Sequence, residues 1–211
     1  TNGYGIYSIL DDDSHRNWIL KAIDGASKDL VSIPDNHTAD IDVPEGVTSI
    51  SAEVHLTHPK DKDGKEKNGY LLRLPASLEI ITGNFLSSTI DTIEFADNSK
   101  IGVIPSGVFS DTNVVNVTIP SSVYRLDGAF QNCKFLESVS IQGREVELRS
   151  TFSGCFNFKE LILVEGACVS LINDTFFNCS FERFDIPEGV VKIDGHVFGN
   201  CSYLVELSIP A

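Results

Sequence analysis

The sequence predicts a β-solenoid, a right-handed stack of coils of about 22 to 24 residues, because one pattern recurs along most of the chain. Phenylalanine returns at intervals of 24, 21, 22, 24 and 22 residues. Each phenylalanine is followed by a short run of alternating apolar and polar residues, as in a strand with one buried face. No coil can enclose its own apolar side chains, so adjacent coils must stack to form a core. The recurring residues are Phe85, Phe109, Phe130, Phe152, Phe176 and Phe198.

The alternating runs define eight predicted strands in register, each with two inward-facing apolar residues. We expect them to form a parallel sheet on one face of the stack. Prolines directly follow several runs, which supports the assignment because proline is tolerated at a strand end and damaging inside a central strand. The inward pairs are Ile41/Val43, Leu72/Leu74, Ile93/Phe95, Val117/Ile119, Val139/Ile141, Leu161/Leu163, Phe184/Ile186 and Leu207/Ile209. The prolines are Pro44, Pro75, Pro120 and Pro187.

Two distant corners share the sequence Pro-Glu-Gly-Val and place Gly46 and Gly189 where a tight turn needs a positive φ. Beyond the corners lie apolar pairs three residues apart, which complete the repeating unit before the next phenylalanine. These pairs are Val123 and Leu126, Val169 and Ile172, and Val190 and Ile193.

Four cysteines form a second column, because each follows one of the last four phenylalanines by three residues. Their spacings of 22, 24 and 22 residues exclude the close cysteine pairs of a zinc site. We interpret them as buried free thiols, with disulfides between neighbouring coils as the alternative. The column holds Cys133, Cys155, Cys179 and Cys201, and the fifth cysteine, Cys168, is expected to be another buried residue outside it.

The composition of the 211-residue chain, 42% hydrophobic and 22% charged, favours a folded core. Its formal net charge of −14 would repel phosphate backbones and anionic lipids, so nucleic acid is not expected as a partner. No apolar run approaches the roughly 18 residues of a membrane span, and we expect no membrane insertion. The chain lacks methionine and a basic leader, so we expect a mature or trimmed segment.

The units VYRLDGAFQNCKFLESVSI and VVKIDGHVFGNCSYLVELSI resemble BspA-type leucine-rich repeats, whose pattern is V-x-x-I-x-x-x-A-F-x-x-C-x-x-L-x-x-V-x-I-P. The resemblance covers residues 72–211. It implies a leucine-rich-repeat solenoid of the kind found in surface and secreted proteins of bacteria and some protozoa, several of which adhere to host proteins. It therefore implies a location at the cell surface or outside the cell.

Three positions depart from this pattern. Ser88 and Thr112 stand where the column has cysteine, and Arg149 stands where an apolar residue is usual. We expect the coils that contain them to be looser than the others.

The repeats are assigned to residues 41–211, and two segments of the chain do not follow their pattern. Residues 1–40 are predicted to cap the first coil, as a β-hairpin of 4–10 and 18–23 joined by a turn at 11–16. A short helix at 14–23 is the alternative. Residues 57–69, rich in charge and glycine, are expected to form a loop inserted into the first coil.

The outward side chains of the strands offer a polar surface for binding a protein or a glycan. We therefore predict a non-catalytic binding module, and an ordinary solvated face is the alternative. A second hypothesis is a targeting or scaffold region of a larger protein whose catalytic domain lies outside this chain. The predicted binding residues are Glu94, Asn116, Thr118, Ser138, Ser140, Glu160, Ile162, Arg183, Asp185 and Glu206.

Motifs for catalysis are not found. The sequence has no Gly-x-Ser-x-Gly and no phosphate-binding glycine loop, so we expect neither an enzyme nor a cofactor. Residues 11–13, three aspartates close to His15, form the one cluster suited to a metal or to acid–base chemistry. We interpret this cluster as a solvated turn and expect no metal site, with a small hydrolase as the third hypothesis.

Overall fold

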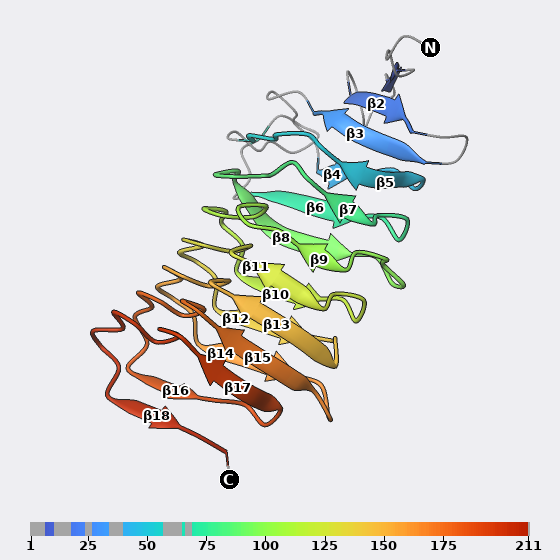
Figure 1. Cartoon of the computed structure of the whole chain (residues 1–211). Helices are drawn as coiled ribbons and strands as arrows, with labels where there is room; N and C mark the ends of the chain where they lie inside the picture. Colours follow the sequence, from blue (N-terminus) through green and yellow to red (C-terminus); the bar gives the residue numbers. More distant parts are fainter. Residues whose placement is uncertain are drawn as a thin grey trace.

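The computed structural model describes residues 7–10, 18–23, 27–33, 40–56, 65 and 69–210, and it is an elongated stack of β-coils (Figure 1). Every regular element in these ranges is a strand. The coils succeed one another in chain order, from the blue N-terminal strands to the red C-terminal ones (Figure 1). The β-solenoid predicted from the repeat is therefore confirmed.

The alternating runs form the first sheet, six parallel strands that lie in coil order. Val117 is aligned with Val139, and Val139 with Leu161, so equivalent residues of successive coils lie side by side. The strands are β4 (Ile41–Asp42), β6 (Tyr70–Leu74), β8 (Ile90–Phe95), β10 (Asn116–Ile119), β12 (Ser138–Ile141) and β14 (Glu160–Leu163).

The last two predicted strands, β16 (Arg183–Asp185) and β18 (Glu206–Ser208), pair with each other in a separate two-stranded sheet. The predicted eight-strand register is thus interrupted after β14. The interruption coincides with a shorter connection, since three residues (180–182) separate Cys179 from β16 but four (156–159) separate Cys155 from β14.

A second sheet of five parallel strands follows the corners along the chain, and the sequence interpretation missed it. The predicted parallel sheet is therefore confirmed, and it is one of two that run along the stack. The second sheet was missed because its apolar residues were paired three apart, as Val169 and Ile172. In the structure Val169 and Leu171 are buried, whereas Ile172 is only partly buried. The inward residues are therefore two apart, as in a strand. The strands are β9 (Val103–Ile104), β11 (Arg125–Asp127), β13 (Glu145–Arg149), β15 (Cys168–Ile172) and β17 (Val190–Asp194).

The N-terminal strands β1 (Tyr7–Leu10) and β2 (Trp18–Ala22) pair antiparallel, as the expected hairpin requires. The helix alternative is therefore wrong for the residues of β2. Strand β3 (Lys28–Ser32) joins β2 to the parallel strands β5 (Val47–Ile50) and β7 (Ile80–Ile81).

Packing also links this end to the coils, because Trp18 is fully buried in the common core. The boundary at residue 40 stays a prediction. The predicted turn at 11–16, with its aspartate and histidine cluster, lies outside the described residues, as does the predicted loop at 57–69 apart from residues 65 and 69.

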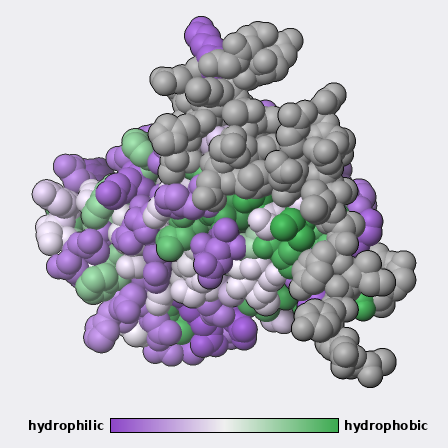
Figure 2. All heavy atoms as spheres, turned by 90° about the horizontal axis from the view of Figure 1, so that it is seen from above, coloured by the Kyte–Doolittle hydropathy of each residue, from purple (hydrophilic) through white to green (hydrophobic). Residues whose placement is uncertain are grey.

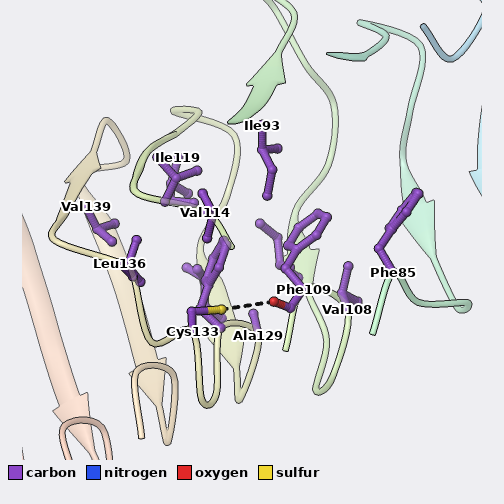
Figure 3. Packing of buried hydrophobic residues seen from close by; sticks show 14 of the residues in the cluster. Phe85, Ile93, Val108, Phe109, Val114, Ile119, Ala129, Cys133, Leu136 and Val139 are labelled. Atoms are coloured by element: carbon purple, nitrogen blue, oxygen red, sulfur yellow. Dashed lines mark hydrogen bonds between the residues drawn. The ribbon is translucent and has the colours of Figure 1, made fainter. Parts of the chain in front are cut away.

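The phenylalanine column runs through the core as one continuous ring stack. Successive ring centroids lie 5.3 to 6.3 Å apart with interplanar angles of 14° to 24°. Phe85 and Phe109 point into the space between the sheets in Figure 3, among Ile93, Val108 and other apolar side chains. The first five rings are fully buried, and Phe198 in the last coil is partly buried. Each of the four inner rings therefore links its own coil to both neighbours.

The cysteine column consists of free thiols, as expected. Each Sγ–H donates a hydrogen bond to the carbonyl oxygen of the phenylalanine one coil earlier, as Cys133 does to Phe109 at 3.1 Å (Figure 3). The equivalent bonds of the other three thiols measure 3.1 to 3.3 Å. Burial raises the pKa of Cys133 to about 11 and that of Cys179 to about 12, so the thiols keep their protons at neutral pH.

The expectation of looser coils is wrong. Ser88 and Thr112 are buried in the cysteine positions, and their hydroxyls donate hydrogen bonds to the carbonyls of Val54 and Phe109 at 3.0 and 2.8 Å. Arg149 points outward from β13 and forms an ion pair with Glu147 at 2.7 Å. The inward position that Arg149 was expected to fill belongs to its neighbour, the fully buried Leu148.

The two predicted corner glycines adopt the positive φ that a tight turn needs. Gly46 and Gly189 have φ angles of 87° and 97°, which glycine adopts without the strain that a side chain would cause. Figure 2, seen from above the N-terminal strands, shows mostly hydrophilic side chains around the visible rim, with smaller apolar patches between them.

Candidate binding surface

The outward side chains of β8, β10, β12 and β14, here called the strand face, lie in two rows across the first sheet. Asn116, Ser138 and Glu160 are aligned in the first row. In the second row, Thr118, Ser140 and Ile162 are aligned in the same way. Glu94 lies on β8, beside β10. Seven of the predicted binding residues are therefore brought together on one sheet.

The other three predicted residues do not continue this sheet. Arg183 and Asp185 lie on β16 and Glu206 lies on β18, in the separate two-stranded sheet. Arg183 and Glu206 are aligned and form an exposed ion pair at 3.4 Å. An exposed pair of this kind adds little stability.

An open depression of about 670 Å³ lies on the strand face and extends to the corner that follows β8. It is lined by six of the predicted residues, namely Glu94, Asn116, Thr118, Ser138, Ser140 and Ile162. The sequence interpretation missed the polar residues that the corners and strand ends add, which are Asp97, Asn98, Ser99, Ser121 and Gln142.

The corner after β8 is longer than its neighbour, and it borders the depression. It holds five residues (96–100) between Phe95 and Ile101, whereas three (120–122) separate the equivalent Ile119 and Val123. The signal in the sequence is the spacing, because 24 residues separate Phe85 from Phe109 but only 21 separate Phe109 from Phe130. Extra residues at a corner extend a surface without disturbing the stack.

Hydrogen bonds hold several of these side chains in place. Ser138 Oγ donates to Asn116 Oδ1 at 2.7 Å, across neighbouring strands. Gln142 Nε2 donates to Ser140 Oγ at 2.8 Å. The Thr118 hydroxyl is exposed and has no protein partner among the residues that the structure describes.

The acidic groups of the strand face are partly neutralised. The Glu94 carboxylate accepts a hydrogen bond from Arg73 Nε at 2.9 Å, and Nη1 of the same arginine lies 2.7 Å from Asp42. Arg73 therefore bridges three successive coils. Arg73 carries one positive charge and pairs with two carboxylates. The three side chains together therefore keep a net negative charge at the edge of the face.

The second sheet presents a different surface, which includes Cys168. The prediction that this cysteine is buried is wrong: Cys168 is exposed on β15, because it alternates with the inward Val169. It lines a second depression of about 550 Å³ with charged neighbours. The other lining residues are Tyr124, Arg125, Glu145, Val146, Glu147 and Ser170.

The side chains of the strand face offer hydrogen-bonding, charged and apolar groups for non-covalent binding. Within the described ranges, no three His, Cys, Asp or Glu residues are grouped to hold a metal ion. The thiols of Cys133, Cys155 and Cys179 are buried and protonated, which removes their nucleophilicity. The described residues also contain no helix suited to crossing a membrane.

Six copies of the BspA type leucine rich repeat region match the sequence, over residues 68–161 and 127–211. The matched ranges cover well over half of the chain, and the phenylalanine and cysteine columns fall within them. The chain therefore belongs to the BspA-type leucine-rich repeat family. No curated protein matches the sequence.

The fold is shared with a solved structure. A leucine rich cell surface protein from Faecalibacterium prausnitzii A2-165 matches with a TM-score of 0.65 and 18% identity, over 98% of this chain and 55% of its own. The pneumococcal vaccine antigen PcpA (TM-score 0.49, 16% identity) covers 97% of this chain and 49% of its own. A leucine-rich repeat protein from Bacteroides ovatus (TM-score 0.42, 15% identity) matches over 97% of this chain and 81% of its own. The chain thus spans about half the length of the first two.

Proposed function

We propose that this chain is a non-catalytic recognition module of a cell-surface or secreted bacterial protein, and that it binds a protein or a glycan in the depression on the strand face. The observation that carries the proposal is the coincidence of this depression with six of the residues predicted from strand alternation. Family membership adds support, as does the likeness to a protein described as a leucine rich cell surface protein.

The fold suits such a role because the site is built on strands. Its side chains are carried by neighbouring strands at the roughly 4.8 Å spacing of a parallel sheet, over a core of stacked rings. Little conformational freedom is therefore lost when a ligand binds. Ile162, which is 42% exposed, supplies apolar contact area among the polar groups.

A matched pair of substitutions tests the location of the site. Ser140 and Ser170 are both partly buried, outward-facing serines in the middle of parallel strands, one on each sheet. Arginine at position 140 would fill the depression, whereas arginine at position 170 would leave it open. The probes are a panel of extracellular-matrix proteins and a glycan array.

Ser140→Arg is expected to weaken binding at least tenfold, or about 1.4 kcal/mol, while Ser170→Arg keeps wild-type affinity. Both variants should keep the wild-type melting temperature, because neither side chain enters the core. Loss of binding in Ser170→Arg alone would place the site on the second sheet and contradict the proposal.

A further inference from the structure

We infer that the depression on the strand face takes a neutral oligosaccharide, an inference that rests on the proposed binding function of this face. Eight of its sixteen lining residues carry a hydroxyl or an amide group. Hydroxyls and amides donate and accept hydrogen bonds, and so do the hydroxyl groups of a sugar. The groups that carry the argument are those of Asn116, Thr118, Ser138, Ser140 and Gln142.

The charge of the lining excludes anionic ligands. No lysine or arginine lines the depression, whereas Glu94 and Asp97 do. A sulfated, sialylated or phosphorylated ligand would meet negative charge there without a cation to pair with it. The net charge of −14 adds a repulsive field over the whole molecule. The charge of the lining therefore disfavours an anionic ligand, and the hydroxyl and amide groups favour a neutral one.

The lining also differs from the centre of a protein–protein interface. Such interfaces depend on a few buried aromatic or arginine anchors in apolar pockets. Here the lining contains no arginine, and its one aromatic residue, Phe95, is partly buried. The other apolar residues of the lining are Ile93, Ala96, Val117, Pro120 and Ile162. The Phe95 ring is held edge-on against Phe109, with centroids 6.4 Å apart. Apolar side chains interspersed with hydroxyl and amide groups match a sugar ring, which has C–H groups on its faces and hydroxyls at its edge.

Two hydrogen bonds within the lining fix side chains in place and leave other polar groups of the same side chains for the ligand. Asn116 accepts from Ser138 through Oδ1, so the amide N–H groups of Asn116 remain for the ligand. Gln142 donates to Ser140, which leaves the Gln142 carbonyl oxygen as an acceptor. Side chains fixed in this way lose little entropy on binding. The volume of about 670 Å³ lies in the usual range for small-molecule sites and accommodates a short oligosaccharide.

The test compares two isosteric substitutions on the same sheet. Thr118 and Thr92 are both exposed, outward-facing threonines on neighbouring strands, but only Thr118 lines the depression. The probe is an array of neutral oligosaccharides, each paired with its sulfated form, and a panel of matrix proteins before and after enzymatic deglycosylation. We expect wild-type protein to bind a neutral member at least tenfold more tightly than its sulfated form.

Thr118→Val is expected to weaken that binding about tenfold, while Thr92→Val leaves it unchanged. Absence of binding to every neutral glycan, or equal binding of the sulfated forms, would overturn the inference. Binding to a deglycosylated protein that Ser140→Arg abolishes would overturn the inference but support the proposed function. Binding that Ser140→Arg leaves intact would contradict both.

Discussion

The column cysteines act as hydrogen-bond donors as well as small core residues. Each thiol donates to a carbonyl of the preceding coil, so it links two coils without a covalent bond. Three of the four thiols are buried, and Cys201 in the last coil is partly buried. Ser88 donates to Val54 of the preceding segment in the same way, while Thr112 donates to Phe109 of its own coil. A residue at this position must therefore be small and must carry a hydrogen-bond donor.

Alkaline pH should destabilise the stack through these thiols. Burial raises the pKa of Cys133 from 9.0 to about 11 and that of Cys179 from 9.0 to about 12. Because the folded pKa is the higher one, the stabilisation is complete below about pH 9 and is lost as the pH rises toward 11 and 12. Urea unfolding between pH 7 and about pH 10.5 measures the loss. The double variant Cys133→Ser and Cys179→Ser should show a shallower decline, and an equal decline would refute this cause.

Cys168 should react faster with a thiol-alkylating reagent than the buried cysteines of the column. Its side chain is exposed on β15, whereas Cys133, Cys155 and Cys179 are buried. Iodoacetamide at neutral pH is therefore expected to label Cys168 rapidly in the folded protein, and Cys168→Ser should remove that fast phase. Peptide mass mapping identifies the labelled residue. Rapid labelling of the three buried cysteines would show that the column is open to solvent.

At the scale of the repeating elements, the ring stack links the coils. Phe152 lies between Phe130 and Phe176, with centroid distances of 6.3 and 5.5 Å, and also packs on Phe158 at 4.9 Å. Its truncation would open a cavity shared by three coils. The rings at the two ends of the column have a stacked neighbour on one side only.

Phe152→Ala is expected to lower the free energy of unfolding by about 3 to 5 kcal/mol, as for other buried aromatic truncations. Phe198 is only partly buried, so Phe198→Ala should cost clearly less. Chemical denaturation of the two variants gives the comparison. Equal losses would mean that the position in the stack does not determine the contribution of a ring.

The sequence predicted the columns, the first-sheet strands and the turns because each repeats at one position per coil. The second sheet escaped prediction because its alternation is short and is broken by a bulge, where Val191 is inserted between residues aligned with Val169 and Ser170. Cys168 was assigned to the core from the usual burial of cysteine, although its place in β15 points it outward. The residues of the strand face could be predicted because side chains alternate along a strand. The corner beside the depression was missed because its position depends on the length of a loop.

At the scale of the whole molecule, stacking commits most apolar residues to one core and leaves two sheet faces and the corners for recognition. The two faces differ in character. The first sheet carries a depression lined by neutral polar and apolar side chains with two carboxylates, and the second carries charged side chains around Cys168. The recognition that we propose belongs to the first sheet because its lining offers unpaired hydroxyl and amide groups.

Backbone chemical-shift mapping with the tightest-binding member of the glycan array tests the central claim most directly. If the ligand occupies the depression, the largest shifts will fall on Asn116, Thr118, Ser140 and the corner at 96–100. The amides of β13 and β15 on the second sheet will then stay unchanged. Shifts concentrated on β13 and β15, with the first sheet unaffected, would contradict the account.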